Sequence, residues 1–232
     1  MIHPLRLYGD PVLRRSAAPV RRFDEELRTL ATDMSETMHD AAGVGLAAPQ
    51  IGRPLRLFVA LELAEHDTDA EPSAANPTEA DGDGDGDDDG GDGGDEGDDE
   101  GDEGDERPEP TVLHEHVMVN PEITHADGRR VAPDGCLSVP GVWIENMVRH
   151  QRIRVRYQDL DGAWHERDAE GHFAHVIQHE TDHLDGILFF DRLEAEDRAR
   201  FLDAYRSELA ELQRRAKAHL KELRRSSAAT PA

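Results

Sequence analysis

The sequence contains one cysteine, few basic residues and no long hydrophobic run. Because Cys136 is the only cysteine, an intramolecular disulfide is excluded, which is typical of a reducing compartment, and we expect a cytoplasmic location. No segment approaches the ~18 consecutive apolar residues of a membrane-spanning helix. The opening residues, MIHPLRLYGDPVLRR, have no apolar run behind a basic tip, so we expect neither a signal peptide nor a membrane partner.

The basic residues are few, but the charge is spread unevenly along the chain. Lys and Arg number 26 against 51 Asp and Glu, and the segment Glu79–Glu106 alone carries 17 acids and no base. The remaining 34 acids and 26 bases make a mildly acidic protein, which argues against specific DNA binding because phosphate backbones need Lys and Arg. Residues 64–110 offer almost nothing apolar to bury, so we predict a disordered acidic insert within one catalytic domain, residues 1–232.

Apolar periodicity on both sides of this insert predicts an α+β fold. We expect mostly antiparallel strands packed around a central helix, followed by a C-terminal helix. Three helices are predicted: the first begins near Phe23 and ends before Gly43, the second runs from Gly171 to about Phe189, and the third covers residues 194–225. The predicted strands are Leu55–Leu63, Val117–Ile123 and a hairpin of Arg152–Gln158 with Trp164–Asp168.

The segment VIQHETDHLDG, Val176–Gly186, places the pattern His-Glu-x-x-His on the predicted central helix. His179 and His183 are one turn apart, about 6 Å along the helix axis, so both imidazoles can approach one metal ion. Glu180 then lies beside a water held by that ion, where it can act as a general base. The motif therefore predicts a catalytic metal site that lacks one ligand.

The third ligand has more than one candidate. His175 cannot join His179 and His183, because that stretch of helix spans ~12 Å and ligands lie within ~2 Å of the metal. A downstream carboxylate, Asp203 or Glu208, would make a zinc endopeptidase, although both are typical of exposed helix charges. Cys136, within DGCLSVPG, would complete a Cys-His-His set with one position open for water, although a lone cysteine is also typical of a small buried side chain.

Three segments in order resemble the peptide deformylase family: GVGLAAPQIG (Gly43–Gly52), DGCLS (Asp134–Ser138) and QHETDHLDG (Gln178–Gly186). YGDPVLR (Tyr8–Arg14) and VNPEI (Val119–Ile123) are also similar to that family. The resemblance spans nearly the whole chain apart from the acidic insert and the end of the last helix. It implies a metal-dependent hydrolase that removes the formyl group from N-formylmethionyl peptides.

The resemblance also implies a role for each motif residue. Cys136, His179 and His183 bind one divalent metal, most often Fe2+, with Ni2+, Co2+ or Zn2+ as substitutes. Glu180 takes a proton from the attacking water and returns it to the leaving amine. The side-chain amide of Gln50 and the backbone N–H of Leu137 stabilise the oxyanion. A simpler interpretation of Gln50 is a turn cap, and of Leu137 a core residue.

The remaining substrate contacts come from two of these segments. The resemblance implies that residues 43–46 pair with an extended peptide, and that the methionine pocket lies nearby. The predicted substrate-binding residues are Gly43, Val44, Gly45, Leu46, Gly135, His175 and Val176. For Val44, Leu46 and Val176 an ordinary core position is the alternative.

Two features depart from the family pattern. Asp134 stands where the family usually has Glu, and we expect it to pair with an arginine, Arg149 being the candidate. Trp143 stands in a loop where polar residues are common. Because new peptides emerge from ribosomes, the basic C-terminal helix is also a candidate for docking on ribosomal RNA, with simple packing on the domain as the alternative.

Overall fold

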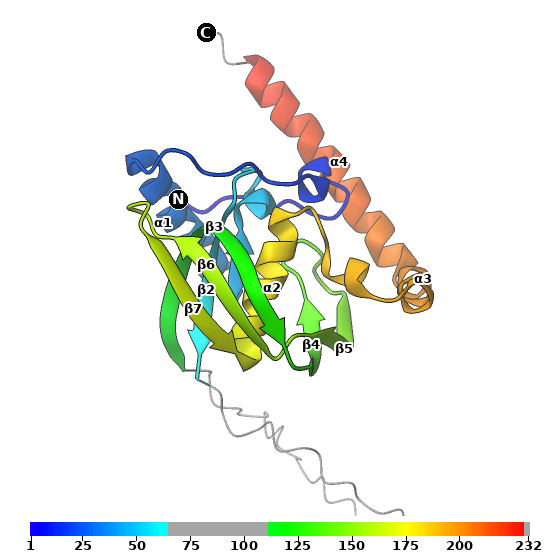
Figure 1. The fold of residues 1–232 in the computed structure, drawn as a ribbon. Coiled ribbons are helices and arrows are strands. Elements are labelled where there is room, and N and C mark those ends of the chain that lie inside the picture. The colour runs from blue at the N-terminus through cyan, green and yellow to red at the C-terminus, as the bar shows by residue number, and fades with distance from the viewer. Residues whose placement is uncertain (65–110, 230–232) are drawn as a thin grey trace, which may run out of the picture.

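The computed structural model describes residues 1–64 and 111–229, so the acidic insert predicted for residues 64–110 lies outside it apart from Ala64 (Figure 1). The strands are β1 (Gly45–Ala47), β2 (Leu57–Leu63), β3 (Val112–Asp127), β4 (Arg130–Gly135), β5 (Trp143–Arg149), β6 (Arg152–Gln158) and β7 (Trp164–Glu170). The α-helices are α1 (Glu25–Asp40), α2 (Gly171–Leu184), α3 (Ala195–Ala204) and α4 (Arg206–Ala229), with 3-10 turns at Pro11–Arg14, Ala48–Ile51 and Phe189–Arg192.

The strands form two antiparallel sheets. The larger sheet has five strands in the order β1-β2-β3-β6-β7, and β4 pairs with β5 in a separate ribbon. In β6 the apolar Ile153 and Val155 are buried and alternate with exposed arginines, as expected of a strand with one buried face. β1 is the short edge strand of the larger sheet, and no strand within residues 1–64 and 111–229 pairs with its outer side.

Strand β2 is buried on both faces, which explains its continuous apolar sequence LFVAL. Phe58 and Ala60 belong to the core cluster that includes α2, whereas Leu57, Val59 and Leu61 belong to the cluster that includes α1. Since successive strand side chains point to opposite faces, α1 and α2 cover opposite faces of the sheet.

Helix α2 is the centre of the molecule (Figure 1). Twelve of its 14 residues are buried, and Phe173, Ile177 and Leu184 pack on the sheet. The polar residues of the helix are therefore inside the protein rather than on its surface. Burial of polar side chains at this density requires partners for them, and these partners form the site described below.

The acidic insert joins two paired strands. Leu63 of β2 is the register partner of Val112 of β3, and the Ala64 N–H donates to the Thr111 carbonyl at 2.8 Å. Both ends of the insert are therefore side by side at the end of a β-hairpin. A long connection at such a position costs little, since the closure entropy of a loop rises slowly with its length.

The α+β class, the antiparallel strands, the central motif helix and the hairpin β6–β7 are confirmed. The ribbon β4–β5 and the short β1 were not predicted, because Pro133 and Gly135 interrupt the pattern of β4, β5 pairs only with β4, and β1 is three residues long. Helix α2 ends at Leu184 rather than near Phe189, since Gly186 adopts a φ of +74° that ends the helix.

The single C-terminal helix predicted for residues 194–225 is instead two helices that meet at Tyr205. Phe201 of α3 stacks on Phe190 with ring centroids 5.3 Å apart, whereas α4 buries Leu209, Leu212 and Ala216. The chain turns between these two packing sites, although no Gly or Pro marks the break. In Figure 1, α4 crosses the domain and projects beyond it.

Candidate metal centre and active site

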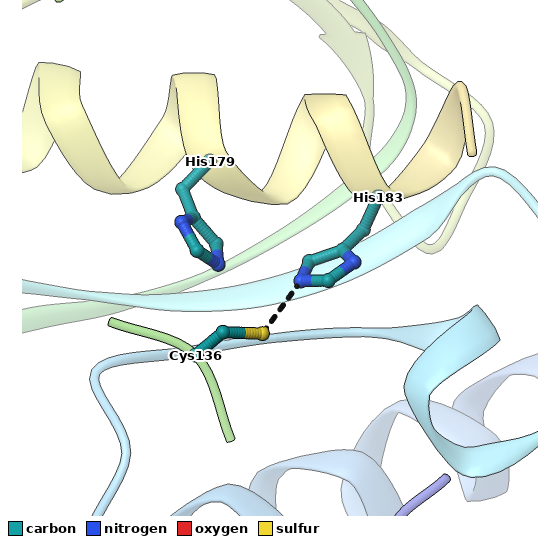
Figure 2. Close-up of side chains that lie close together, drawn as sticks. All are labelled: Cys136, His179 and His183. Carbon is teal, nitrogen blue, oxygen red and sulfur yellow. Dashed lines mark hydrogen bonds between the residues drawn. The ribbon is translucent and has the colours of Figure 1, made fainter. Parts of the chain in front are cut away.

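Three potential metal ligands converge on one point between α2 and the loop after β4 (Figure 2). The ligand atoms of Cys136, His179 and His183 all lie within 4.8 Å of one another, and Cys136 Sγ lies 3.1 Å from His183 Nε2. Ligands arranged tetrahedrally around one ion are about 3.5 Å apart. A thiolate and two imidazoles at this spacing fit a divalent transition metal with small adjustments.

The competing ligand set of the endopeptidase interpretation is not assembled. Asp203 is 71% exposed and pairs with Arg206, and Glu208 is also exposed and bonds with Ser207. Among residues 1–64 and 111–229, Cys136, His179 and His183 are the metal-ligating side chains whose ligand atoms lie close enough together to share one ion. The alternative of Asp203 or Glu208 as third ligand is not supported, because both lie on the outer surface of α3 and α4.

The buried carboxylate of Asp134 is bonded to the His179 ring nitrogen that faces away from the ligand cluster. Asp134 Oδ1 accepts from His179 Nδ1 at 2.8 Å, which turns the His179 Nε2 toward Cys136 and His183. Asp134 Oδ2 lies 2.9 Å from Arg149 Nε and 3.2 Å from His175 Nε2. The predicted pair of Asp134 with Arg149 is confirmed. Such a partner fixes the ring orientation of a metal-binding histidine.

The sequence did not indicate the next members of this network. Asp182, one turn after Gln178 on α2, accepts from Arg149 Nη1 at 3.0 Å and from Arg192 Nε at 3.1 Å. Both Asp134 and Asp182 are almost completely buried. The carboxyl groups of the β4–β5 ribbon and of α2 are thus bridged by Arg149, which holds the Cys136 loop against the helix that carries the histidines.

The charges of this cluster displace the pKa values of its members. Burial opposes ionisation of Asp134, but the charge of His179 and hydrogen bonds from both His175 and His179 hold its pKa well below the usual range. Burial opposes protonation of His179, yet the charge of Asp134 raises its pKa. Burial lowers the pKa of His183, which keeps that imidazole neutral and able to bind a metal.

Glu180 lies beside the ligands and is buried. Burial raises the pKa of Glu180 to about 7, and its Oε2 has no hydrogen-bond partner among the described residues. A side chain at Gly45 would collide with Glu180, since a Cβ there would lie 2.5 Å from Oε1. The glycine therefore allows β1 to pass directly over the carboxyl group, and a carboxyl group with this pKa can exchange protons near neutral pH.

The side chain of Gln50 faces the same point. Its Nε2 lies 3.7 Å from Cys136 Sγ and 3.4 Å from Ser138 Oγ, while its Oε1 accepts from the Ala47 N–H at 2.7 Å. Gln50 thus caps a turn, as the simpler interpretation predicted, and also directs its N–H groups at the ligand cluster. No described residue accepts from the backbone N–H of Leu137, whose side chain packs in the core.

A cleft of about 1140 Å³ opens over this cluster. Its lining includes the predicted Gly43, Val44, Gly45, Gly135, His175 and Val176 together with Cys136 and Glu180. It also includes Trp143, which is 56% exposed and covers Gly135, and Arg215 of α4. Trp143, which departs from the family pattern, therefore forms part of the cleft wall. Arg215 was not predicted there, because only the packing of α4 brings it to the cleft.

The side chain of Leu46, predicted to help bind the substrate, lies away from the cleft. Leu46 has no exposed surface and packs with Met34 and Met38 of α1, outside the cleft lining. Since neighbouring strand residues face opposite ways, Leu46 points to the α1 side of the sheet and Ala47 to the α2 side. The alternative interpretation, an ordinary core position, is the observed one.

Comparisons with known proteins identify the family. The model of the family "Polypeptide deformylase" matches residues 2–199. Peptide deformylase of Thermus thermophilus is 46% identical over 224 residues, covering 96% of this chain and 98% of that protein. A crystal structure of peptide deformylase from Thermus thermophilus superposes with a TM-score of 0.70 at 41% identity, covering 93% of this chain and 99% of that chain.

A further solved structure carries a bound peptide. The Met-Ala-Ser-bound class I type b peptide deformylase from Acinetobacter baumannii matches with a TM-score of 0.62 at 27% identity, covering 83% of this chain and 99% of that one. Sequence, fold and the Cys-His-His cluster agree. This chain belongs to the polypeptide deformylase family and is a hydrolase that removes the N-formyl group from newly made polypeptides.

Proposed function

We propose that Cys136, His179 and His183 hold the divalent metal of this deformylase, with Fe2+ as the physiological ion and Ni2+, Co2+ or Zn2+ as substitutes. The bound ion supplies Lewis acidity, which polarises a carbonyl oxygen and makes a water acidic near neutral pH. The observation that supports this proposal most is the approach of the three ligand atoms to within 4.8 Å of one another, beside a cleft that Cys136 and His179 line.

In this proposal Glu180 moves the protons. As a carboxylate it accepts a proton from the attacking water, and it then donates that proton to the nitrogen that leaves when formate is released. A pKa of about 7 in the metal-free protein suits both steps, because neither form of the side chain is strongly favoured near neutral pH. The absence of a partner for Oε2 among the described residues leaves this oxygen available to water.

Gln50 and Leu137 are the proposed donors to the oxyanion. The Nε2 of Gln50 is directed at the ligand cluster, and the Ala47 N–H and Ser138 hydroxyl hold the amide in that orientation. The Leu137 N–H follows Cys136 directly in the chain. Donors that are fixed before the reaction stabilise the developing charge, and loss of one costs about 10²–10³ in rate.

The substrate is proposed to bind as an extended peptide beside β1. No strand of the described ranges pairs with the outer side of this edge strand, and Gly43, Val44 and Gly45 line the cleft there. The structure of the Acinetobacter baumannii relative with bound Met-Ala-Ser supports a peptide as the ligand of this chain. Val176 and His175 would wall the pocket for methionine, with Gly135 beside the formyl group.

The first experiment is formate release from formyl-Met-Ala-Ser, with protein purified without oxygen and loaded with Fe2+ or Ni2+. We expect release that disappears on chelation and falls by about 10²–10⁴ in Glu180→Ala, which retains the three ligands and therefore the metal. Equal release by Glu180→Ala would contradict the role of this residue. A comparison of Fe2+, Ni2+, Co2+ and Zn2+ in the same assay tests the preference for iron.

The ribosome is the proposed macromolecular partner, and the cytoplasm the proposed location. No helix in the described ranges is long and apolar enough to cross a membrane. α4 buries Leu209, Leu212 and Ala216, while its basic residues Arg214, Arg215, Lys217, Arg224 and Arg225 are exposed. Packing and docking therefore use different sides of the helix. Cosedimentation with ribosomes that is lost in Lys217→Glu/Arg225→Glu, with formate release unchanged, is the expected result.

A further inference from the structure

The wall of the catalytic cleft carries a tryptophan that neither the metal centre nor the proposed proton transfer uses. Trp143 is the first residue of β5, lines the cleft and is 56% exposed. Within residues 1–64 and 111–229 no cation covers its indole, whereas the ring of Trp164 on β7 lies 4.2 Å from the guanidinium carbon of Arg156. An indole that is left exposed inside a cleft is typical of a side chain that contacts a ligand.

Strand pairing places this indole directly over Gly135. The two residues are register partners in the β4–β5 ribbon. A Cβ built on Gly135 would lie 2.4 Å from both Cε3 and Cζ3 of Trp143, so the ring occupies the space that a side chain would otherwise take. Gly135 precedes the ligand Cys136 directly in the chain. The indole is therefore next to the metal centre, and the backbone of the ribbon holds it there.

Trp143 lies on the face of the ribbon that points away from α2. Asp134 marks the opposite face, because its buried carboxylate accepts from His179 of that helix. Successive strand residues point to opposite faces and register partners share a face, so Gly135 and Trp143 face the other way. Burial agrees with this assignment, since Ile144, the register partner of Asp134, is buried while Trp143 is exposed.

The position of Trp143 selects one residue of the substrate. This step rests on the proposed function, in which an extended formylmethionyl peptide lies beside β1 with Gly135 next to the formyl group. The methionine side chain then points toward His175 and Val176 of α2. In an extended chain the next side chain points the opposite way, away from α2. The residue directly after the methionine is therefore the one that meets the indole.

The chemistry of this part of the wall is apolar. Nine large apolar side chains of the described residues are exposed, and three of them, Ile2, Val44 and Trp143, line this cleft. The indole offers a broad apolar face with a single N–H donor. A polar side chain laid against this face would lose water without gaining a full set of hydrogen bonds, whereas an apolar one gains from the burial.

We propose that Trp143 is a specificity-determining residue, which selects peptides with an apolar side chain directly after the formylmethionine. The contact is made away from the bond that breaks, so it stabilises the bound substrate and the transition state alike. Such uniform binding changes KM and leaves kcat nearly constant. We expect a preference of about tenfold in kcat/KM for leucine over asparagine, two side chains of similar shape.

The test compares formate release from formyl-Met-Leu-Ser and formyl-Met-Asn-Ser by the full-length, Ni2+-loaded protein. The wild type should favour the leucine peptide, mainly through KM. Trp143→Ala should bring the ratio of the two kcat/KM values close to one, and Trp143→Phe, which keeps an aromatic ring, should retain most of the preference. Trp164→Ala changes the other of the two tryptophans, which is 50% exposed outside the cleft lining, and as the matched control should leave both rates unchanged.

A fluorescence titration tests the contact without turnover. In Trp164→Phe the remaining tryptophan is Trp143, and its emission should change saturably as the product peptide Met-Leu-Ser is added. Equal kcat/KM for both substrates in the wild type, or a preference that persists in Trp143→Ala, would overturn the proposal. If neither substrate releases formate, the proposed function fails, and the titration alone decides the contact: emission that stays constant up to saturating peptide would overturn it.

Discussion

Polar side chains around the metal centre are paired with residues far away in the sequence, whereas those of α4 are paired within one helical turn. His179 and Asp134 are 45 residues apart, and both are buried. Arg214 and Glu211 on α4 are three residues apart and exposed. Exposed pairs of this kind contribute little, while breaking a buried pair leaves an uncompensated charge. Ion pairs with the same chemistry therefore contribute very differently to stability, depending on whether they are buried or exposed.

The first way to test this comparison is to remove the ligand that comes from the distant loop. Cys136→Ser should reduce bound metal from about one equivalent per chain to near zero and abolish formate release, because serine is a poor ligand for such ions. Elemental analysis of the purified protein measures this. Asp203→Asn on α3 is the control and should retain both metal and turnover. Loss of metal in that control would support Asp203 as the third ligand instead of Cys136.

The second test removes a charge that never touches the metal. Asp134→Asn keeps the size of the side chain but weakens its hold on His179 and Arg149, and should cost about 10–100-fold in metal affinity or turnover. The rate of metal release to a chelator is the readout. Asp134→Glu, the usual family residue, should retain most of the affinity. An unchanged release rate in Asp134→Asn would show that the network is only structural.

The third test concerns the pH dependence of formate release. In the proposed mechanism Glu180 works as a carboxylate. The rate should then rise as pH passes upward through its pKa, which is about 7 in the metal-free protein and lower once a cation is beside it. The acid limb of kcat/KM should therefore have its midpoint at or below pH 7. The charge of Asp134 raises this pKa, so Asp134→Asn should move the midpoint to lower pH. A shift to higher pH would contradict the assignment.

The smallest effect is expected from the acidic insert. Leu63 and Val112 are paired and Ala64 bonds to Thr111, so replacing residues 65–110 by a short turn leaves the hairpin β2–β3 closed. Melting temperature and turnover of formyl-Met-Ala-Ser should both stay close to wild type. A large loss of either would show that the insert acts on the folded domain. Exposed charged segments could then no longer be regarded as unimportant beside the buried network.

Much of this architecture was predictable from local patterns. The alternation in Arg152–Gln158 and the apolar run in Leu57–Leu63 are direct consequences of strand geometry, and both strands were found where expected. The β4–β5 ribbon was missed because Pro133 and Gly135 interrupt the local pattern of β4, and because the pairing of both strands depends on partners across the ribbon. The break at Tyr205 was missed for the same reason, since packing rather than helix propensity turns the chain.

The residues of the site likewise fall into those that local sequence patterns indicate and those that only packing decides. Spacing alone placed His179, Glu180 and His183 on one helix, and neighbouring motifs pointed to Cys136, because these are properties of short segments. The sequence could not show that the Leu46 side chain faces the core, because the pattern of a strand shows which residues share a face but not which face covers the cleft.

The sequence by itself therefore determined the family and the α+β class, and it predicted the types of metal ligand and the base. Only the tertiary structure decided how that chemistry is held. The bridge from Asp134 through Arg149 to Asp182 and the position of Trp143 and Arg215 in the cleft wall both join segments far apart in the chain. Contacts between distant segments depend on how whole elements pack, and no local pattern records that.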